Sequence, residues 1–164
     1  MSGAPGRGES ASRQLTVFIK KYEPALAALA RAALAKMRKR VPGAMELVYD
    51  NYNALVIGFG PTERASEAVL SIALYPRWVN LFFLQGARLA DPQGLLQGDG
   101  ARVRRVLVSD AAVLDAPGVK ALIAQAVAAS PIPFPGPRRR HMVIKSVSAR
   151  QRPRRPRLGR VKKP

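Results

Sequence analysis

The chain contains no cysteine, only one histidine and one tryptophan, and 10 acidic residues against 28 basic ones. Without thiols the protein can form neither disulfides nor Cys-ligated zinc or iron–sulfur centres, and cysteine-dependent catalysis is excluded. The lack of cysteine also fits a reducing compartment, so we expect a cytoplasmic protein.

Long apolar segments are missing as well. The longest apolar runs, residues 25–30 and 54–59, are far shorter than the roughly 20 residues that a membrane-spanning helix requires. Residues 1–8 are polar and lack the apolar stretch of a secretory signal peptide. We therefore expect no membrane partner.

The sequence offers no catalytic centre. A hydrolase triad needs a histidine beside a nucleophile, and the one histidine, His141, follows three arginines in a proline-rich stretch. No Gly-x-Ser-x-Gly motif occurs, and the spacing of the acidic residues nominates no pair of carboxylates. We interpret His141 as a solvated loop or strand-edge residue. We expect a protein that is not an enzyme and that has no cofactor and no metal.

The hydrophobic pattern predicts helices at both ends of a run of short strands. Helical spacing covers residues 12–40 in two pieces that meet before Pro24, and a last helix starts at Asp115. Apolar or alternating runs bounded by turn residues predict strands at 46–49, 54–59, 68–75, 78–84, 103–109 and 142–149. This order predicts an α+β two-layer sandwich: a mainly antiparallel sheet of about five or six strands, with the N-terminal and C-terminal helices packed on it.

Composition divides the chain into three parts. Residues 1–14 and 150–164 are poor in apolar side chains, so we expect a disordered N-terminus and a disordered basic tail. Residues 15–149 form the predicted domain, in which a proline-rich connector, 131–141, leads to the last strand.

Most of the net charge of +18 lies near the C-terminus. Residues 1–14, 15–130 and 131–164 carry net charges of +1, +5 and +12. A flexible cation of this kind attracts nucleic acid or another polyanion without sequence preference. The alternatives are a solubilising tail or a tail that pairs with an acidic protein. The predicted polyanion-binding residues are Arg150, Arg152, Arg154, Arg155, Arg157, Arg160, Lys162 and Lys163.

The polar aromatic residues of the two predicted hairpins are a candidate ligand site. At adjacent strand ends they could form a shallow cleft in which rings stack on a planar ligand. The alternative is that the polar residues only make turns and that Trp78 packs in the core with Phe82 and Phe83. The cleft residues are Tyr49, Tyr52, Asn53, Tyr75, Arg77 and Trp78.

The glycine-rich segment before the fifth predicted strand is a candidate anion loop. Glycines let backbone N–H groups approach an anion, and arginines neutralise it. The alternative is a loop that feeds an edge strand whose arginines face water. The residues of this loop are Gly98, Gly100, Arg102 and Arg104.

Four segments of the chain resemble the YdhG-like family of domains of unknown function, and more closely a bacterial subgroup of it. They are ELVYDNYNALVIGFG at 46–60, IALYPRWVNLFFL at 72–84, the glycine and arginine segment 98–105, and IKSVSARQRPRRP at 144–156. The resemblance covers roughly residues 16–156. The resemblance implies a small α/β domain with a terminal helix packed on an antiparallel sheet, and it implies little about activity.

The resemblance also implies a second function. One relative in the broad family resembles frataxin and is regarded as an intracellular iron chaperone, so a small-ligand or iron carrier that uses the sheet cleft is the alternative to a polyanion-binding module. Iron held without Cys or His clusters needs grouped carboxylates. Glu46 and Asp50 lie four residues apart on one predicted strand, which corresponds to about 13 Å. Glu63 and Glu67 could share a helical face, but they flank Arg64.

Overall fold

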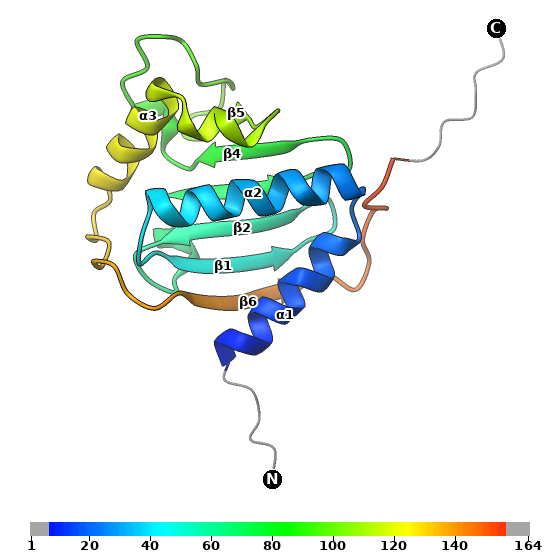
Figure 1. Ribbon diagram of the computed structural model, residues 1–164. Coiled ribbons are helices and arrows are strands. Elements are labelled where there is room, and N and C mark those ends of the chain that lie inside the picture. The colour runs from blue at the N-terminus through cyan, green and yellow to red at the C-terminus, as the bar shows by residue number, and fades with distance from the viewer. Residues whose placement is uncertain (1–6, 157–164) are drawn as a thin grey trace, which may run out of the picture.

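The computed structural model describes residues 7–156, with side chains from Ser10 onward (Figure 1). In this part of the chain the helices are α1 (Arg7–Lys20), α2 (Pro24–Arg40) and α3 (Pro117–Ala128). The strands are β1 (Met45–Asp50), β2 (Leu55–Gly60), β3 (Leu70–Leu74), β4 (Val79–Phe83), β5 (Arg104–Leu107) and β6 (His141–Val147). The predicted α+β class is confirmed.

The six strands form one sheet in the order β5-β4-β3-β2-β1-β6. Strands β1 to β5 pair antiparallel with their sequence neighbours. Tight turns join β1 to β2 and β3 to β4, and longer loops make the other two connections. Strand β6 returns after α3 and pairs parallel with β1 at the far edge. The last predicted strand therefore joins the main sheet, and β5 and β6 are its two edges.

The helices cover one face of the sheet (Figure 1). The core row Val48, Ile57, Ile72 and Leu81 runs straight across neighbouring strands, and each of these side chains is fully buried. Helix α2 packs on this face with a stripe of small and medium side chains that includes Ala30, Ala33, Leu34 and Met37. Because side chains alternate along a strand, the intervening residues point to the other face.

The other face, which we call the open face, is covered by none of the three α-helices α1, α2 and α3. Near β1 and β2 it is overlaid by the loop that contains the short 3₁₀ helix η1 (Ala65–Glu67), and a Cβ on Gly60 would lie only 3.0 Å from the Cα of Ala68. Its two cross-strand rows begin on β1 and end on β5: Leu47, Gly58, Ser71, Phe82 and Arg105, and Tyr49, Val56, Ala73, Asn80 and Leu107.

The predicted disorder of residues 1–14 is wrong for residues 7–14, because α1 begins at Arg7. The apolar stripe of this helix begins earlier than expected, at Ala11, and continues through Leu15, Phe18 and Ile19, all of which are buried in the core. Helix α1 packs against β6, so a strand from the end of the chain provides the surface that orders it. Residues 1–6 lie outside the described residues.

The predicted disorder of the C-terminal tail is wrong for residues 150–156. This segment, which we call the C-terminal strap, follows β6 and contains Arg154, whose residue surface is only 5% exposed. The predicted tail cations Arg157, Arg160, Lys162 and Lys163 lie outside the described residues.

Candidate nucleic-acid interface

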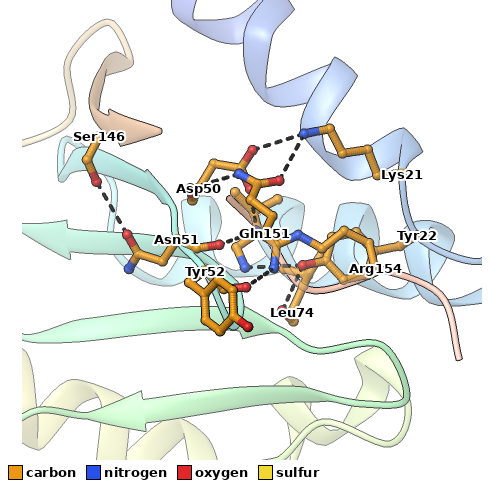
Figure 2. A network of polar contacts seen from close by, with 10 residues as sticks. Lys21, Tyr22, Asp50, Asn51, Tyr52, Leu74, Ser146, Gln151 and Arg154 are labelled. Carbon is orange, nitrogen blue, oxygen red and sulfur yellow. Dashed lines mark hydrogen bonds and ion pairs between the residues drawn. The ribbon is translucent and has the colours of Figure 1, made fainter. Parts of the chain in front are cut away.

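A buried ion pair ties the C-terminal strap to the end of β1 (Figure 2). Asp50 ends β1 on the helix-covered face and is 1% exposed. Arg154 Nη2 lies 2.8 Å from Asp50 Oδ1, and Lys21 Nζ lies 3.2 Å from Asp50 Oδ2. Because an isolated buried carboxylate is costly, the two cations compensate a charge that the apolar surroundings would otherwise destabilise.

Further hydrogen bonds fix the position of the strap. The Arg154 guanidinium also donates to the backbone oxygens of Tyr52, at 3.3 Å, and of Asn51. Gln151 Nε2 donates to the backbone oxygen of Asp50 at 3.0 Å. The guanidinium carbon of Arg154 lies 5.8 Å from the centre of the Tyr22 ring. Arg154 is therefore a structural residue.

The Tyr22 side chain is also part of this cluster. Its hydroxyl donates to the backbone oxygen of Leu74 at 2.9 Å and accepts from the backbone N–H of Leu55 at 3.1 Å. Burial raises the pKa of Tyr22 to about 12, because the phenolate would lose its hydration. The cluster thus joins the connection between α1 and α2, three strands and the strap.

The exposed arginines of the strap differ from Arg154. The guanidinium of Arg152 lies over the ring of Tyr52, 5.6 Å from its centre, and Arg155 Nε donates to the backbone oxygen of Lys21 at 3.2 Å. Arg150 is exposed. The prediction that Arg154 contacts a polyanion is wrong because its guanidinium is already bound to Asp50, whereas the other three side chains stay accessible.

The two hairpin turns and the strap enclose a shallow groove. It has a volume of about 620 Å³. Its walls include the two aromatic residues of the second turn and two arginines of the strap, Arg152 and Arg155. The lining residues are Asn53, Tyr75, Pro76, Arg77, Trp78, Arg152, Pro153, Arg155 and Pro156. Four of the six predicted cleft residues are among them.

Of the two aromatic side chains that line the groove, Trp78 is exposed to solvent and Tyr75 is half-buried. Trp78 is 47% exposed, and its ring centre lies 5.8 Å from that of Tyr75 with an interplanar angle of 34°. The alternative that Trp78 packs in the core is therefore wrong, although Phe83 does pack there. Tyr52 is exposed beside Arg152 but does not line the groove, and Tyr49 lies half-buried on the open face, where burial raises its pKa.

The groove shares Tyr75, Arg77 and Trp78 with a second hollow of about 640 Å³ on the open face. This hollow extends across β4 to the edge strand β5. Its remaining lining residues are Asn80, Phe82, Gln97, Arg105 and Leu107. The two hollows therefore form one surface around the second hairpin turn.

This surface is positively charged. In the described part of the chain, none of Arg77, Arg105, Arg152 and Arg155 lies within ion-pair distance of a carboxylate. Guanidinium groups without a carboxylate partner are available for bidentate contacts with phosphate.

Carboxylates suited to iron are not brought together. Glu46, at the other end of β1, is buried and accepts from Arg38 Nε at 3.1 Å and from Arg38 Nη2 at 2.8 Å. Asp50 is bound to Arg154 and Lys21, and the described residues contain no group of three or more His, Asp or Glu side chains that could hold a metal ion. The residues present therefore do not fit an iron site.

In the candidate anion loop, the Arg104 guanidinium binds the loop's own backbone, whereas the Arg102 side chain is exposed to solvent. Arg104 Nη1 donates to the backbone oxygen of Val103 at 2.9 Å and to that of Gly100. A Cβ on Gly86 would lie 2.5 Å from the Cβ of Arg104, so a glycine there leaves room for this packing. Carbonyl oxygens, not N–H groups, surround this guanidinium. The geometry favours the alternative of a loop that feeds an edge strand.

His141 is the first residue of the edge strand β6, in agreement with its interpretation as an exposed strand-edge residue. Its Nε2 lies 2.9 Å from Glu63 Oε1, and Lys145 Nζ donates to the backbone oxygen of Glu63 at 3.1 Å. These contacts hold the loop between β2 and β3 against β6.

The chain matches no protein-family model, no curated protein and no solved structure. The resemblance to the YdhG-like family therefore stays a prediction. None of the helices in the described part of the chain has the length and hydrophobicity of a membrane span. What the fold defines is an α+β sandwich that leaves one sheet face open.

Sequence reasoning missed the residues that extend the candidate site across the open face. Asn80, Phe82 and Arg105 were not singled out, although each occupies the position in its strand that alternates with a core residue. The alternation along each strand was the signal that could have placed these residues on the face opposite the core. The sequence could not show which side of the sheet the helices cover.

Proposed function

We propose that the protein is a non-enzymatic cytoplasmic binding module that contacts nucleic acid through an arginine-rich surface around the second hairpin turn. The observation that carries the proposal is the group of four arginines beside Tyr75 and Trp78 that have no carboxylate partner in residues 7–156: Arg77, Arg105, Arg152 and Arg155.

The electrostatics of such a surface favour a polyanion. Each phosphate that an arginine neutralises releases counterions, and it contributes about −0.7 to the log–log salt slope for a single strand. Four arginines correspond to a slope of about −3. The aromatic rings next to the arginines favour nucleic acid over a polyanion without bases, since bases stack on exposed rings.

The proposal is tested by measuring the affinity of the full chain for a fluorescently labelled oligonucleotide by anisotropy at a series of NaCl concentrations. The double variant Arg152→Gln/Arg155→Gln should make the salt slope shallower by about 1.4, because two phosphate contacts are lost. Removal of residues 150–164 is a poor test, because it also removes Arg154 and leaves Asp50 with one cation.

A matched control is the double variant Arg31→Gln/Lys120→Gln, which removes two exposed cations from α2 and α3 on the helix-covered side. Its net charge equals that of the strap variant, so a general effect of charge would change both equally. No salt-dependent binding by the parent protein, or equal slopes for the two double variants, would contradict the proposal.

A small-ligand carrier is the second candidate, and the groove itself favours it. Its volume of about 620 Å³ falls within the range of about 300–1,000 Å³ that is typical of small-molecule sites. Native mass spectrometry of the purified protein should then show a bound compound that Trp78→Ala loses. A protein that carries no compound when purified without denaturant would count against this candidate.

A further inference from the structure

Asn80 has an unusual environment on the open face. It is the second residue of β4 and is only 7% exposed, and its side chain forms no hydrogen bond within residues 7–156. In the described residues the fully buried side-chain atoms without a hydrogen-bond partner are Arg40 Nε and Arg154 Nε, so the Asn80 amide still reaches solvent. Asn80 also lines the hollow on the open face, so a ligand in that hollow can supply the missing partner.

Aromatic rings lie on both sides of this amide. Trp78 and Phe82 are two residues before and two residues after Asn80, so all three point to the same face of the sheet. Along an extended strand the two aromatic residues are about 13 Å apart. The Tyr75 ring contacts that of Trp78, and Phe82 is the direct cross-strand neighbour of Arg105.

We propose that this part of the open face binds the unpaired bases of single-stranded nucleic acid. The rings of Tyr75, Trp78 and Phe82 stack on bases, the Asn80 amide hydrogen-bonds to a base edge, and Arg77 and Arg105 contact the phosphates. We call these six residues the base platform. The inference rests on the proposed function, and it adds which form of nucleic acid is bound and by which residues.

The platform favours a single strand over a duplex for a geometric reason. Bases in a duplex are stacked on one another and expose only their edges, whereas bases of a single strand can turn their faces toward aromatic side chains. The Asn80 amide lies on the sheet between the rings of Trp78 and Phe82. It can reach the edge of a base only when that base lies flat against the sheet. The arginines next to the rings, Arg77 and Arg105, contact the phosphates that link successive bases.

Trp78 is the one tryptophan of the chain, so its fluorescence reports directly on the platform. The full chain is titrated with oligo(dT), with an oligo(dA)·oligo(dT) duplex of the same length, and with heparin, a polyanion that has no bases. We expect oligo(dT) to quench Trp78 and to bind more tightly than the duplex. Heparin should bind without quenching.

Substitutions then separate stacking from charge. Measured by the anisotropy of labelled oligo(dT) and labelled heparin, Phe82→Ala and Trp78→Ala should each weaken oligo(dT) binding about tenfold or more, with heparin affinity unchanged. Asn80→Ala should weaken oligo(dT) binding several-fold, and its thermal unfolding is measured in parallel to verify that the sheet is intact. The control is Val17→Ala, which removes an exposed apolar side chain from α1 and should change neither affinity.

The outcomes distinguish the platform from the proposed function. If oligo(dT), duplex and heparin bind equally and none quenches Trp78, the platform is overturned while polyanion binding stands. If none of the three binds in a salt-dependent way, the proposed function fails. If Phe82→Ala and Trp78→Ala bind oligo(dT) like the parent protein, the assignment of the rings is wrong.

Discussion

The two faces of the sheet are made by the same strands, yet they have opposite characters. On the helix-covered face, Ile72 and Leu81 belong to a fully buried apolar row under α2. One residue away, Ser71, Phe82 and Arg105 form a cross-strand row of small, aromatic and charged side chains without a helix above it. The large apolar core lies on the helix-covered face, whereas Phe82 and Arg105 on the open face keep part of their surface exposed.

The faces also differ in how they handle charge. Both carboxylates of β1, Glu46 and Asp50, are buried on the helix-covered face, where Arg38 and Arg154 pair with them. Arg77 and Arg105, which line the hollow on the open face, have no carboxylate partner in the described part of the chain. The surroundings of this hollow are therefore positively charged, although the loop that overlays the face near β1 and β2 carries the ion pair of Arg64 and Glu67.

Neighbouring residues of β4 give the largest expected difference between the faces. Leu81→Ala removes a fully buried side chain and should lower the free energy of unfolding by about 3–4 kcal/mol. Phe82→Ala should lower it by only about 1 kcal/mol, because Phe82 is half-buried. Urea unfolding monitored by circular dichroism measures both. Similar losses in the two variants would mean that the open face is also part of the core.

Removal of the Arg154 guanidinium tests the link between the strap and the covered face. Arg154→Met should lower the free energy of unfolding by about 3 kcal/mol, because the buried Asp50 carboxylate keeps only Lys21 as a partner. Arg155→Met, on the exposed side of the strap, is the control and should have almost no effect. In the double variant Asp50→Leu/Arg154→Met, the loss should be smaller than in Arg154→Met alone, since no buried charge is left unpaired.

Tyr22 gives the cluster at the end of β1 a pH dependence in alkaline solution. Its pKa of about 12 in the folded protein exceeds the ordinary value of 10.0, so the folded state holds a proton that the unfolded state has lost. The stability is complete below about pH 10 and falls by at most about 3 kcal/mol as the pH rises to about 12. Tyr22→Phe should abolish this part of the pH dependence, whereas Tyr52→Phe, at an exposed ring, should not.

The smallest effect is expected at Asp115, on the surface of the helical layer. Hydrogen bonds from Lys36 and Arg40 lower the pKa of this carboxyl. Its contribution to stability is therefore present above the ordinary pKa of 3.8 and is lost as the pH falls further through the lowered value. Asp115→Asn should make acid unfolding slightly less steep. A marked loss of stability at neutral pH would show that the ion pairs of Asp115 with Lys36 and Arg40 stabilise the fold more than surface ion pairs usually do.

Much of the fold follows from local patterns. Helical and strand periodicities, with Pro24 and Pro117 at helix starts, predicted the order and type of the elements, because each depends on residues close together in the chain. Four of the six cleft residues were also predicted to come together, since they lie at the turns of adjacent hairpins. The order at the start of α1, in residues 7–14, and in the strap was missed, because both segments depend on contacts with distant parts of the chain.

The sequence by itself determined the α+β class, the strand alternation and the excess of positive charge, all of which can be read from composition and spacing. The tertiary structure alone decided that Arg154 is buried against Asp50, that Trp78 is exposed, and that Asn80 lacks a hydrogen-bond partner in the described residues. The physical reason is that burial and charge pairing depend on which distant segments meet. These contacts between distant segments form only when the helices pack on one face of the sheet and leave the other face uncovered.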